Sequence, residues 1–412
     1  MGQAPPAIGK PCAAREPQAE VSRGSRGSSS RSGALQLFVL VHGICGSSRD
    51  WEVWKNRLEL RRRADWEVRA SDSITPFSYF GGYEVHKLGE LLAKQVAEWV
   101  NELLNSHQTV VLHFICHSLG GLVARAALPR ICEWDLPGVV HGHFVTLNTP
   151  HLGVRGANLW MCWKNMGVLI PIKSFNQIHQ LTLQDERSDV APLREESGSS
   201  FGRRSARLLE ELADPQSRYC QALARFKTRT AVAASHWDVI VPFSTAAICS
   251  TNPFPSPNIF AGHLQTFWRV DAAVGFKAGT RLAKCHQNGG EAAAAFERSL
   301  KEAGAAESFD GSDEASQASG ESDGSLTPRR PRRQRWQRSS DYEVEFTPDM
   351  LKGLLMGPVW RRVVYTLHQP WVNADVHLFT IGKDRKVLGW SIEFIDLLIS
   401  MFQDTDDAAP CG

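Results

Sequence analysis

The chain has 412 residues, 42% of them hydrophobic and 22% charged, which is typical of a soluble globular protein with a sizeable core. A formal net charge of +2 argues against a nucleic-acid-binding protein held by a broad basic field. Nine cysteines, an odd number without a Cys-x-x-Cys pair, form no disulfide-like framework and favour a reducing compartment. Since no apolar run reaches about 18 residues, we expect no membrane-spanning helix.

The first 34 residues are rich in Pro, Ala, Ser, Gly and Arg and contain no apolar signal core. We therefore expect a disordered tail at 1–34 rather than a secretory signal. A cytoplasmic location is the main expectation. A chloroplast transit peptide, which is also rich in Arg and Ser, is the alternative, and Glu16 and Glu20 count against it.

From residue 35 the chain alternates between two hydrophobic patterns. Apolar runs predict strands, and apolar residues at spacings of three and four predict helices. The predicted strands are 35–41, 66–70, 109–115 and 139–147, and the predicted helices are 84–104 and 122–128. Strands that alternate with helices predict an α/β fold, with a mostly parallel central sheet and helices on both faces.

The sequence Cys-His-Ser-Leu-Gly at 116–120 connects a predicted strand to a predicted helix. A strand that turns sharply into a helix through x-His-Ser-x-Gly is typical of the nucleophile elbow of α/β-hydrolases. The turn strains the serine backbone and requires small neighbours, so that the hydroxyl of Ser118 stands clear of the sheet. Cys116 replaces the first glycine of the usual pattern, and we interpret it as a tolerated small residue. An ordinary strand-to-helix turn is the alternative.

Residues 153–226 interrupt the alternation and predict an insertion. Its apolar and aromatic first part, 159–172, is typical either of a cap over the pocket of a hydrolase or of plain core packing. A further strand is predicted at 229–235, just before Asp238. We assign 35–285 to the first part of a hydrolase domain.

A second interruption spans 286–344, where an Ala/Glu/Ser/Asp/Gly-rich segment precedes the arginine-rich run 329–338. Its low hydrophobicity and blocks of like charge predict a disordered insertion. The arginine run suits peripheral contact with anionic lipid headgroups of a membrane or a nuclear-import patch. A solvated linker whose two charge blocks attract each other is the alternative.

The C-terminal part of the domain is predicted at 345–404 and is followed by a tail at 405–412. It contains a strand at 359–367, a loop around His377 and an amphipathic closing helix at 390–402.

Acyl transfer from an ester needs a nucleophile, a base, an acid that orients the base, and donors to the oxyanion. In an α/β-hydrolase their chain order is Ser, then Asp or Glu, then His. Ser118 is the candidate nucleophile, and Asp238 is the candidate acid, with a turn-forming aspartate as the alternative. His236, on the strand end, is expected to have a local structural role. His377 is the preferred base because His368 directly ends a strand and has little loop with which to reach the serine, and the choice stays open.

Backbone N–H groups are expected to hold the oxyanion. In this fold they come from the residue after the nucleophile, Leu119, and from the loop after the first core strand, where Ile44 is the second donor. The glycine in His42-Gly43 lets the backbone approach the substrate. We expect His42, Gly43 and His117, which flank these donors and the serine, to line the substrate site.

Four segments together resemble the "putative serine esterase" (lipase-like) family of α/β-hydrolases. They are 40–46 with Asp50-Trp51, 116–121, Thr-Pro-His-Leu-Gly at 149–153, and 238–242. The resemblance spans 35–285 and 345–402. It implies an intracellular lipase or carboxylesterase that acts on acyl lipids without metal or organic cofactor. It also implies a triad of Ser118, Asp238 and a late histidine. The final histidine motif departs from the family pattern, with Asp375 near the expected place, which leaves the base open.

Three functional hypotheses follow from these observations. The first is a serine hydrolase that cleaves carboxylic esters of lipids through an acyl-enzyme. The second is a catalytically inactive hydrolase-fold scaffold, which Cys116 and the uncertain histidine favour. The third is an acyltransferase or thioesterase that uses the same triad. The expected partner is a lipid acyl-ester substrate, and no nucleic-acid partner is expected.

Overall fold

The computed structural model describes part of the chain, namely residues 32–61, 63–75, 78, 82–134, 136–155, 176–185, 207–250, 252, 254, 266–271, 346–357, 359–367, 375–384 and 388–403. The expected disordered insertion 286–344, the tail 405–412 and most of the tail 1–34 lie outside these residues. The aromatic segment 159–172 and His368 also lie outside them.

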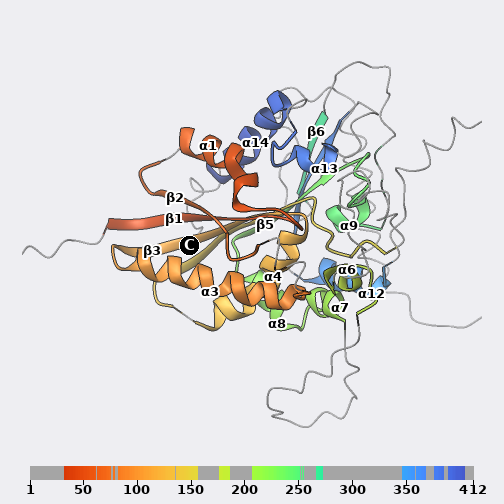
Figure 1. The fold of residues 1–412 in the computed structure, drawn as a ribbon, viewed down its shortest axis with the longest axis horizontal. Helices are drawn as coiled ribbons and strands as arrows, with labels where there is room; N and C mark the ends of the chain where they lie inside the picture. Colours follow the sequence, from red (N-terminus) through yellow and green to blue (C-terminus); the bar gives the residue numbers. More distant parts are fainter. Residues whose placement is uncertain are drawn as a thin grey trace, which may run out of the picture.

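A sheet forms the centre of the molecule (Figure 1). It has seven strands in the order β2-β1-β3-β4-β5-β7-β6. The strands are β1 (Ser32–Val41), β2 (Trp66–Ala70), β3 (His107–His117), β4 (Val139–Leu147), β5 (Thr228–Ala234), β6 (Thr266–Asp271) and β7 (Arg361–Thr366). All neighbouring pairs are parallel except β6 and β7. The predicted α/β-hydrolase fold is confirmed. Strand β6 was not predicted, and β1 begins three residues earlier than predicted.

Strand β1 lies between β2 and β3, so the chain leaves β1 toward one edge of the sheet and returns on its other side. In open parallel sheets, ligands bind at such a switch point, beyond the carboxyl ends of the strands. The segment after β1 and the turn after β3 therefore lie where a site is expected.

Two apolar layers cover the sheet, because successive side chains of a buried strand point to opposite faces. Leu37 and Val39 of β1 join the core under α3 (Val85–Leu104), α4 (Leu119–Glu133) and α8 (Arg218–Ala224). Phe38 of β1 joins the core under α1 (Glu52–Leu60) and α14 (Leu388–Gln403) on the other face (Figure 1). Among the described residues, no helix is long and apolar enough to cross a membrane.

The described residues also form smaller helices. They are the 3-10 helix η1 (Ser48–Trp51), α6 (Asn176–Leu181), α7 (Leu208–Ala213), α9 (Phe243–Ala247), α12 (Pro348–Met356) and α13 (Asp375–Phe379). The described ends of the predicted insertion 153–226 pack into the main core, with Ile178 of α6 and Leu209 of α7 in the layer of α3 and α4. A cap formed by 159–172 stays a prediction.

His377 lies in the short helix α13, whereas a loop was predicted there. The reason is tertiary packing. Val376 and Phe379, three residues apart, lie on one helix face and are both fully buried in the layer of α14. The ring of Phe379 stacks on Tyr365 of β7 at 5.1 Å, which fixes the helix beside the end of that strand.

The buried histidines His113 of β3 and His143 of β4 stack on each other on one face of the sheet. The ring of His113 lies 4.6 Å from the ring of Phe38 and 5.0 Å from the ring of His143. Its Nδ1 accepts a hydrogen bond from the amide of His143, so its proton resides on Nε2, which faces Gln36 Oε1 at 2.8 Å. Burial, and then Lys227, lower the pKa of His143 from 6.5 to about 4.

This lowered pKa predicts acid sensitivity. Unfolded His143 binds a proton near pH 6.5 and folded His143 only near pH 4, so folding stability falls as pH falls through this interval. The difference amounts to about 3 kcal/mol between pH 7 and pH 4. Urea unfolding of the parent and of His143→Gln at both pH values tests this. The variant should lose less stability than the parent, and equal losses would contradict the assignment.

Candidate active site

Ser118 connects β3 to α4 through a strained turn. Its φ of 53° and ψ of −128° place it in a region that residues with side chains rarely adopt. Both of its backbone polar groups are held, since its amide donates to Leu147 O at 2.8 Å and its carbonyl accepts from Thr149 Oγ1 at 2.9 Å. Hydrogen bonds from the neighbouring strand and loop therefore maintain the sharp turn that the sequence predicts.

Glycines let the segment after β1 approach this turn closely. A Cβ at Gly120 would overlap the carbonyl oxygens of Val41 and His42, and a Cβ at Gly43 would lie 2.8 Å from Ser118 Cβ. The first turn of α4 and the loop after β1 are therefore in direct contact. The two segments that are predicted to supply the oxyanion donors therefore lie next to each other.

Cys116 is fully buried in the core layer under α3 and α4. Burial raises the pKa of its thiol well above 9.0, so the side chain stays neutral. It acts as a small apolar residue at the end of β3, which agrees with its interpretation as a tolerated replacement of glycine.

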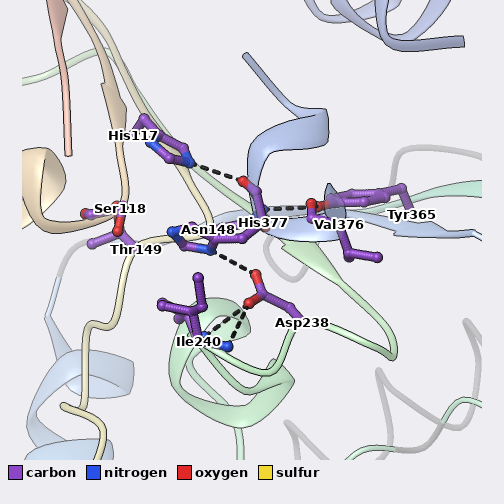
Figure 2. A network of polar contacts seen from close by, with 10 residues as sticks. His117, Ser118, Asn148, Thr149, Asp238, Ile240, Tyr365, Val376 and His377 are labelled. Atoms are coloured by element: carbon purple, nitrogen blue, oxygen red, sulfur yellow. Dashed lines mark hydrogen bonds and ion pairs between the residues drawn. The ribbon is translucent and has the colours of Figure 1, made fainter. Parts of the chain in front are cut away.

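His377 and Asp238 form a buried pair, with 2.8 Å between His377 Nδ1 and Asp238 Oδ2. The other carboxylate oxygen, Oδ1, accepts the amides of Ile240 at 3.0 Å and Val241 at 2.9 Å. Since a carboxylate only accepts, the imidazole Nδ1 carries a proton, and in the neutral ring Nε2 is then the acceptor. In Figure 2 the imidazole projects between Asp238 and Ser118.

Among the described residues, no hydrogen bond joins the His377 imidazole to the Ser118 hydroxyl. Such bonds are often long before substrate binds. His236, the nearby histidine expected to have a structural role, places its Nδ1 3.0 Å from Ser235 Oγ. Of the two candidate bases, only His377 lies among the described residues.

The oxyanion candidates lie on the two segments that Gly43 and Gly120 bring into contact. Leu119 begins α4, and the first N–H groups of a helix have no acceptor within the helix and lie at its positive end. Ile44 follows Gly43 and precedes Cys45, whose φ is 54°. The amide of Gly46 donates to Gly43 O at 3.0 Å, which closes the turn around Ile44.

The two histidines expected to line the substrate site are buried, and their ring nitrogens lie within hydrogen-bond distance of backbone carbonyls. His42 places Nδ1 3.0 Å from Gly43 O and Nε2 2.9 Å from Ile74 O. His117 Nε2 lies 2.9 Å from the carbonyl of His377, and burial, followed by His377, lowers the pKa of His117 well below 6.5. These contacts position the two loops, and contact of His42 and His117 with substrate stays a prediction.

Three polar residues near the site were not singled out from the sequence. Thr149 belongs to the Thr-Pro-His-Leu-Gly motif. The motif identified the segment, but it did not predict the hydrogen bond from the Thr149 hydroxyl to the carbonyl of Ser118. Asn148 and Tyr365 bond to each other at 2.7 Å although 217 positions separate them. Among the described residues, no cluster of three His, Cys, Asp or Glu side chains could hold a metal ion.

The sheet topology, the strained serine and the buried His–Asp pair define a protein of the α/β-hydrolase class. Residues 31–251, more than half of the chain, match the family model described as "Putative serine esterase (DUF676)". The chain belongs to this family. The matched span contains Ser118 and Asp238 and ends before His377.

Two yeast relatives carry lipase names. "Putative lipase YDR444W" of Saccharomyces cerevisiae is 30% identical over 235 residues, 52% of this chain and 32% of that protein. "Putative lipase C4A8.10" of Schizosaccharomyces pombe is 27% identical over 231 residues, 52% of this chain and 26% of that protein. The match thus covers a third or less of the length of each relative.

Solved structures with similarity to the chain include Aspergillus fumigatus lipase B, at 18% identity and a TM-score of 0.22, covering 29% of this chain and 26% of the lipase. The RedJ thioesterase of Streptomyces coelicolor shows 16% identity and a TM-score of 0.28, covering 49% of this chain and 73% of the thioesterase. These low scores add nothing to the argument from topology.

The contact between the elbow and the loop after β1 can be tested with two glycines. Gly120→Ala is expected to lower the free energy of unfolding by about 2 kcal/mol, because its Cβ would overlap two carbonyl oxygens. Gly389→Ala in α14 is the matched control, since among the described residues no atom outside its own chain neighbours and helix backbone lies within 4 Å of the added Cβ. Urea unfolding should show no loss for the control. Equal stability of the two variants would contradict the close approach.

Proposed function

We propose that this chain is a serine hydrolase that cleaves carboxylic esters of lipids through an acyl-enzyme. The observation that carries the proposal is the buried pair of His377 and Asp238, which projects toward the strained Ser118. Membership of the serine esterase family and the lipase names of the yeast relatives support an acyl-lipid substrate.

In the proposed first step, Ser118 Oγ attacks the ester carbonyl carbon while its proton moves to His377 Nε2. Asp238 stabilises the imidazolium through Nδ1. The carbonyl oxygen becomes an oxyanion, which accepts hydrogen bonds from the amides of Leu119 and Ile44. Collapse of the tetrahedral intermediate breaks the bond to the alcohol, and His377 returns the proton to the leaving oxygen.

In the proposed second step, water attacks the acyl-enzyme with His377 again taking the proton. Collapse of the second tetrahedral intermediate breaks the bond between the acyl carbon and Ser118 Oγ, and His377 returns the proton to that oxygen, which releases the fatty acid and regenerates Ser118. An acyltransferase would differ only in using an alcohol in place of water, and a thioesterase only in the leaving group, so the substrate assay below distinguishes them.

Ser118→Ala tests the nucleophile. The variant should lose covalent labelling by a fluorophosphonate probe and should hydrolyse a p-nitrophenyl ester about 10³-fold more slowly, because the acyl-enzyme cannot form. Its thermal unfolding should match that of the parent. Hydrolysis at the parent's rate would show that another residue is the nucleophile, and an unlabelled parent protein would favour an inactive scaffold.

A panel of acyl substrates tests the proposed class. Mono-, di- and triacylglycerols, phospholipids and acyl thioesters are supplied with and without an alcohol acceptor, and free fatty acid and transfer product are both measured. We expect fatty acid from at least one lipid ester, abolished by Ser118→Ala. Transfer product in excess of fatty acid would assign the chain to the acyltransferases, and cleavage of thioesters alone to the thioesterases.

A further inference from the structure

The backbone of helix α13, which carries His377, is held by side chains from three other parts of the sheet. Tyr365 at the end of β7 donates its hydroxyl proton to Val376 O at 2.8 Å. His117, at the end of β3, and Asn148, just after β4, contact His377 O at 2.9 Å and 3.3 Å (Figure 2). Two successive carbonyls of the helix thus receive three side-chain donors.

The short helix leaves the His377 carbonyl available for these donors. In a longer α-helix the amide four residues on, here that of Ile381, would bond to it. Ile381 instead donates to Leu378 O at 3.2 Å, since the last turn is tighter. The carbonyl of His377 is therefore satisfied by His117 and Asn148 rather than by its own helix.

Donor and acceptor roles in this network are fixed. The Tyr365 hydroxyl gives its proton to Val376, so its oxygen accepts from Asn148 Nδ2 at 2.7 Å. The second N–H of the Asn148 amide is then directed to His377 O. Burial raises the pKa of Tyr365 well above 10.0 and lowers that of His117 well below 6.5, so both remain neutral donors.

The network is retained at an energetic cost. Asn148 is fully buried with a φ of 49°, and its side-chain Oδ1 has no hydrogen-bond partner among the residues that the structure describes. A buried oxygen without a partner destabilises a fold, and a left-handed backbone adds a smaller cost at an asparagine. Such features concentrate where function requires a particular geometry.

We propose that His117, Asn148 and Tyr365 form a carbonyl clamp, a set of positioning residues that holds His377 in register between Asp238 and Ser118. The clamp acts on the backbone of the base, whereas Asp238 acts on its ring. His117 also directly precedes Ser118, so one residue connects the nucleophile's turn to the base's helix. This inference rests on the proposed function and adds three residues to its machinery.

Tyr365→Phe tests the clamp, because it removes one hydroxyl that bonds to both Asn148 and Val376. The maximum rate of fluorophosphonate labelling should fall about 10- to 100-fold, the size expected for a base misplaced by about 1 Å. The probe concentration that gives half-maximal rate should stay unchanged, because no clamp residue is proposed to contact the probe. Tyr219→Phe is the matched control, since the Tyr219 hydroxyl contacts Arg218 at 3.2 Å in remote helix α8.

Two variants of His117 separate loss of the donor from loss of packing. His117→Phe keeps a ring but has no donor, whereas His117→Gln offers an amide N–H to the carbonyl of His377. We expect His117→Gln to be labelled about tenfold faster than His117→Phe. Circular dichroism and thermal unfolding verify that each variant is folded.

The outcomes are distinguishable. A labelled parent together with equal labelling rates for the parent and Tyr365→Phe would overturn the clamp and leave the proposed function intact. Equal labelling rates for His117→Phe and His117→Gln would show that His117 does not belong to the clamp. This comparison does not depend on Tyr365→Phe, so it still tests the clamp if Tyr365→Phe does not fold. A parent that is not labelled at all would overturn both the proposed function and the clamp.

Discussion

The hydrogen bond between Asp238 and His377 is the interaction on which the account of this site depends. Both partners are buried, and the carboxylate accepts two backbone amides besides the imidazole. An isolated buried carboxylate would be costly, and these three donors offset that cost. The bond also fixes which ring nitrogen carries the proton, which leaves Nε2 available to a nucleophile.

The sheet order makes this bond possible. Ser118 follows β3, Asp238 follows β5 and His377 follows β7, and in the sheet these strands lie in the order β3-β4-β5-β7. Because the four strands are parallel, all three residues lie beyond the carboxyl ends of the strands, on the same side of the sheet. Adjacent strands lie about 4.8 Å apart, so β3 and β7 are separated by roughly 14 Å. The turn after β5 and helix α13 bridge that gap.

Much of this site was predictable from local patterns. The strand-to-helix turn around Ser118 has a short sequence signature whose chemistry is local, and Asp238 follows a strand that is clearly apolar. The histidine was harder. A loop was predicted around His377, and the burial of Val376 and Phe379 against α14 selects a helix instead. Periodicity in so short a segment does not outweigh packing.

The supporting residues were beyond the reach of sequence patterns for a different reason. Asn148 bonds to the carbonyl of His377, 229 positions away, and no local pattern records such a pairing. His42 and His117 stood out as polar residues beside the candidate serine, but their burial and carbonyl partners emerge only in three dimensions. Sequence patterns identified the candidate reacting groups, whereas the contacts that hold these groups are found only in the structure.

The identity of the general base is the central claim, and a comparison of two buried histidines tests it most directly. Fluorophosphonate labelling of Ser118 is followed in time for the parent, His377→Ala, Asp238→Asn and His236→Ala. The labelling rates of His377→Ala and Asp238→Asn should fall about 10³-fold or more, because the base and its orienting acid are removed. His236→Ala should be labelled at the parent's rate. Rapid labelling of His377→Ala would contradict the account and move the base elsewhere in the chain.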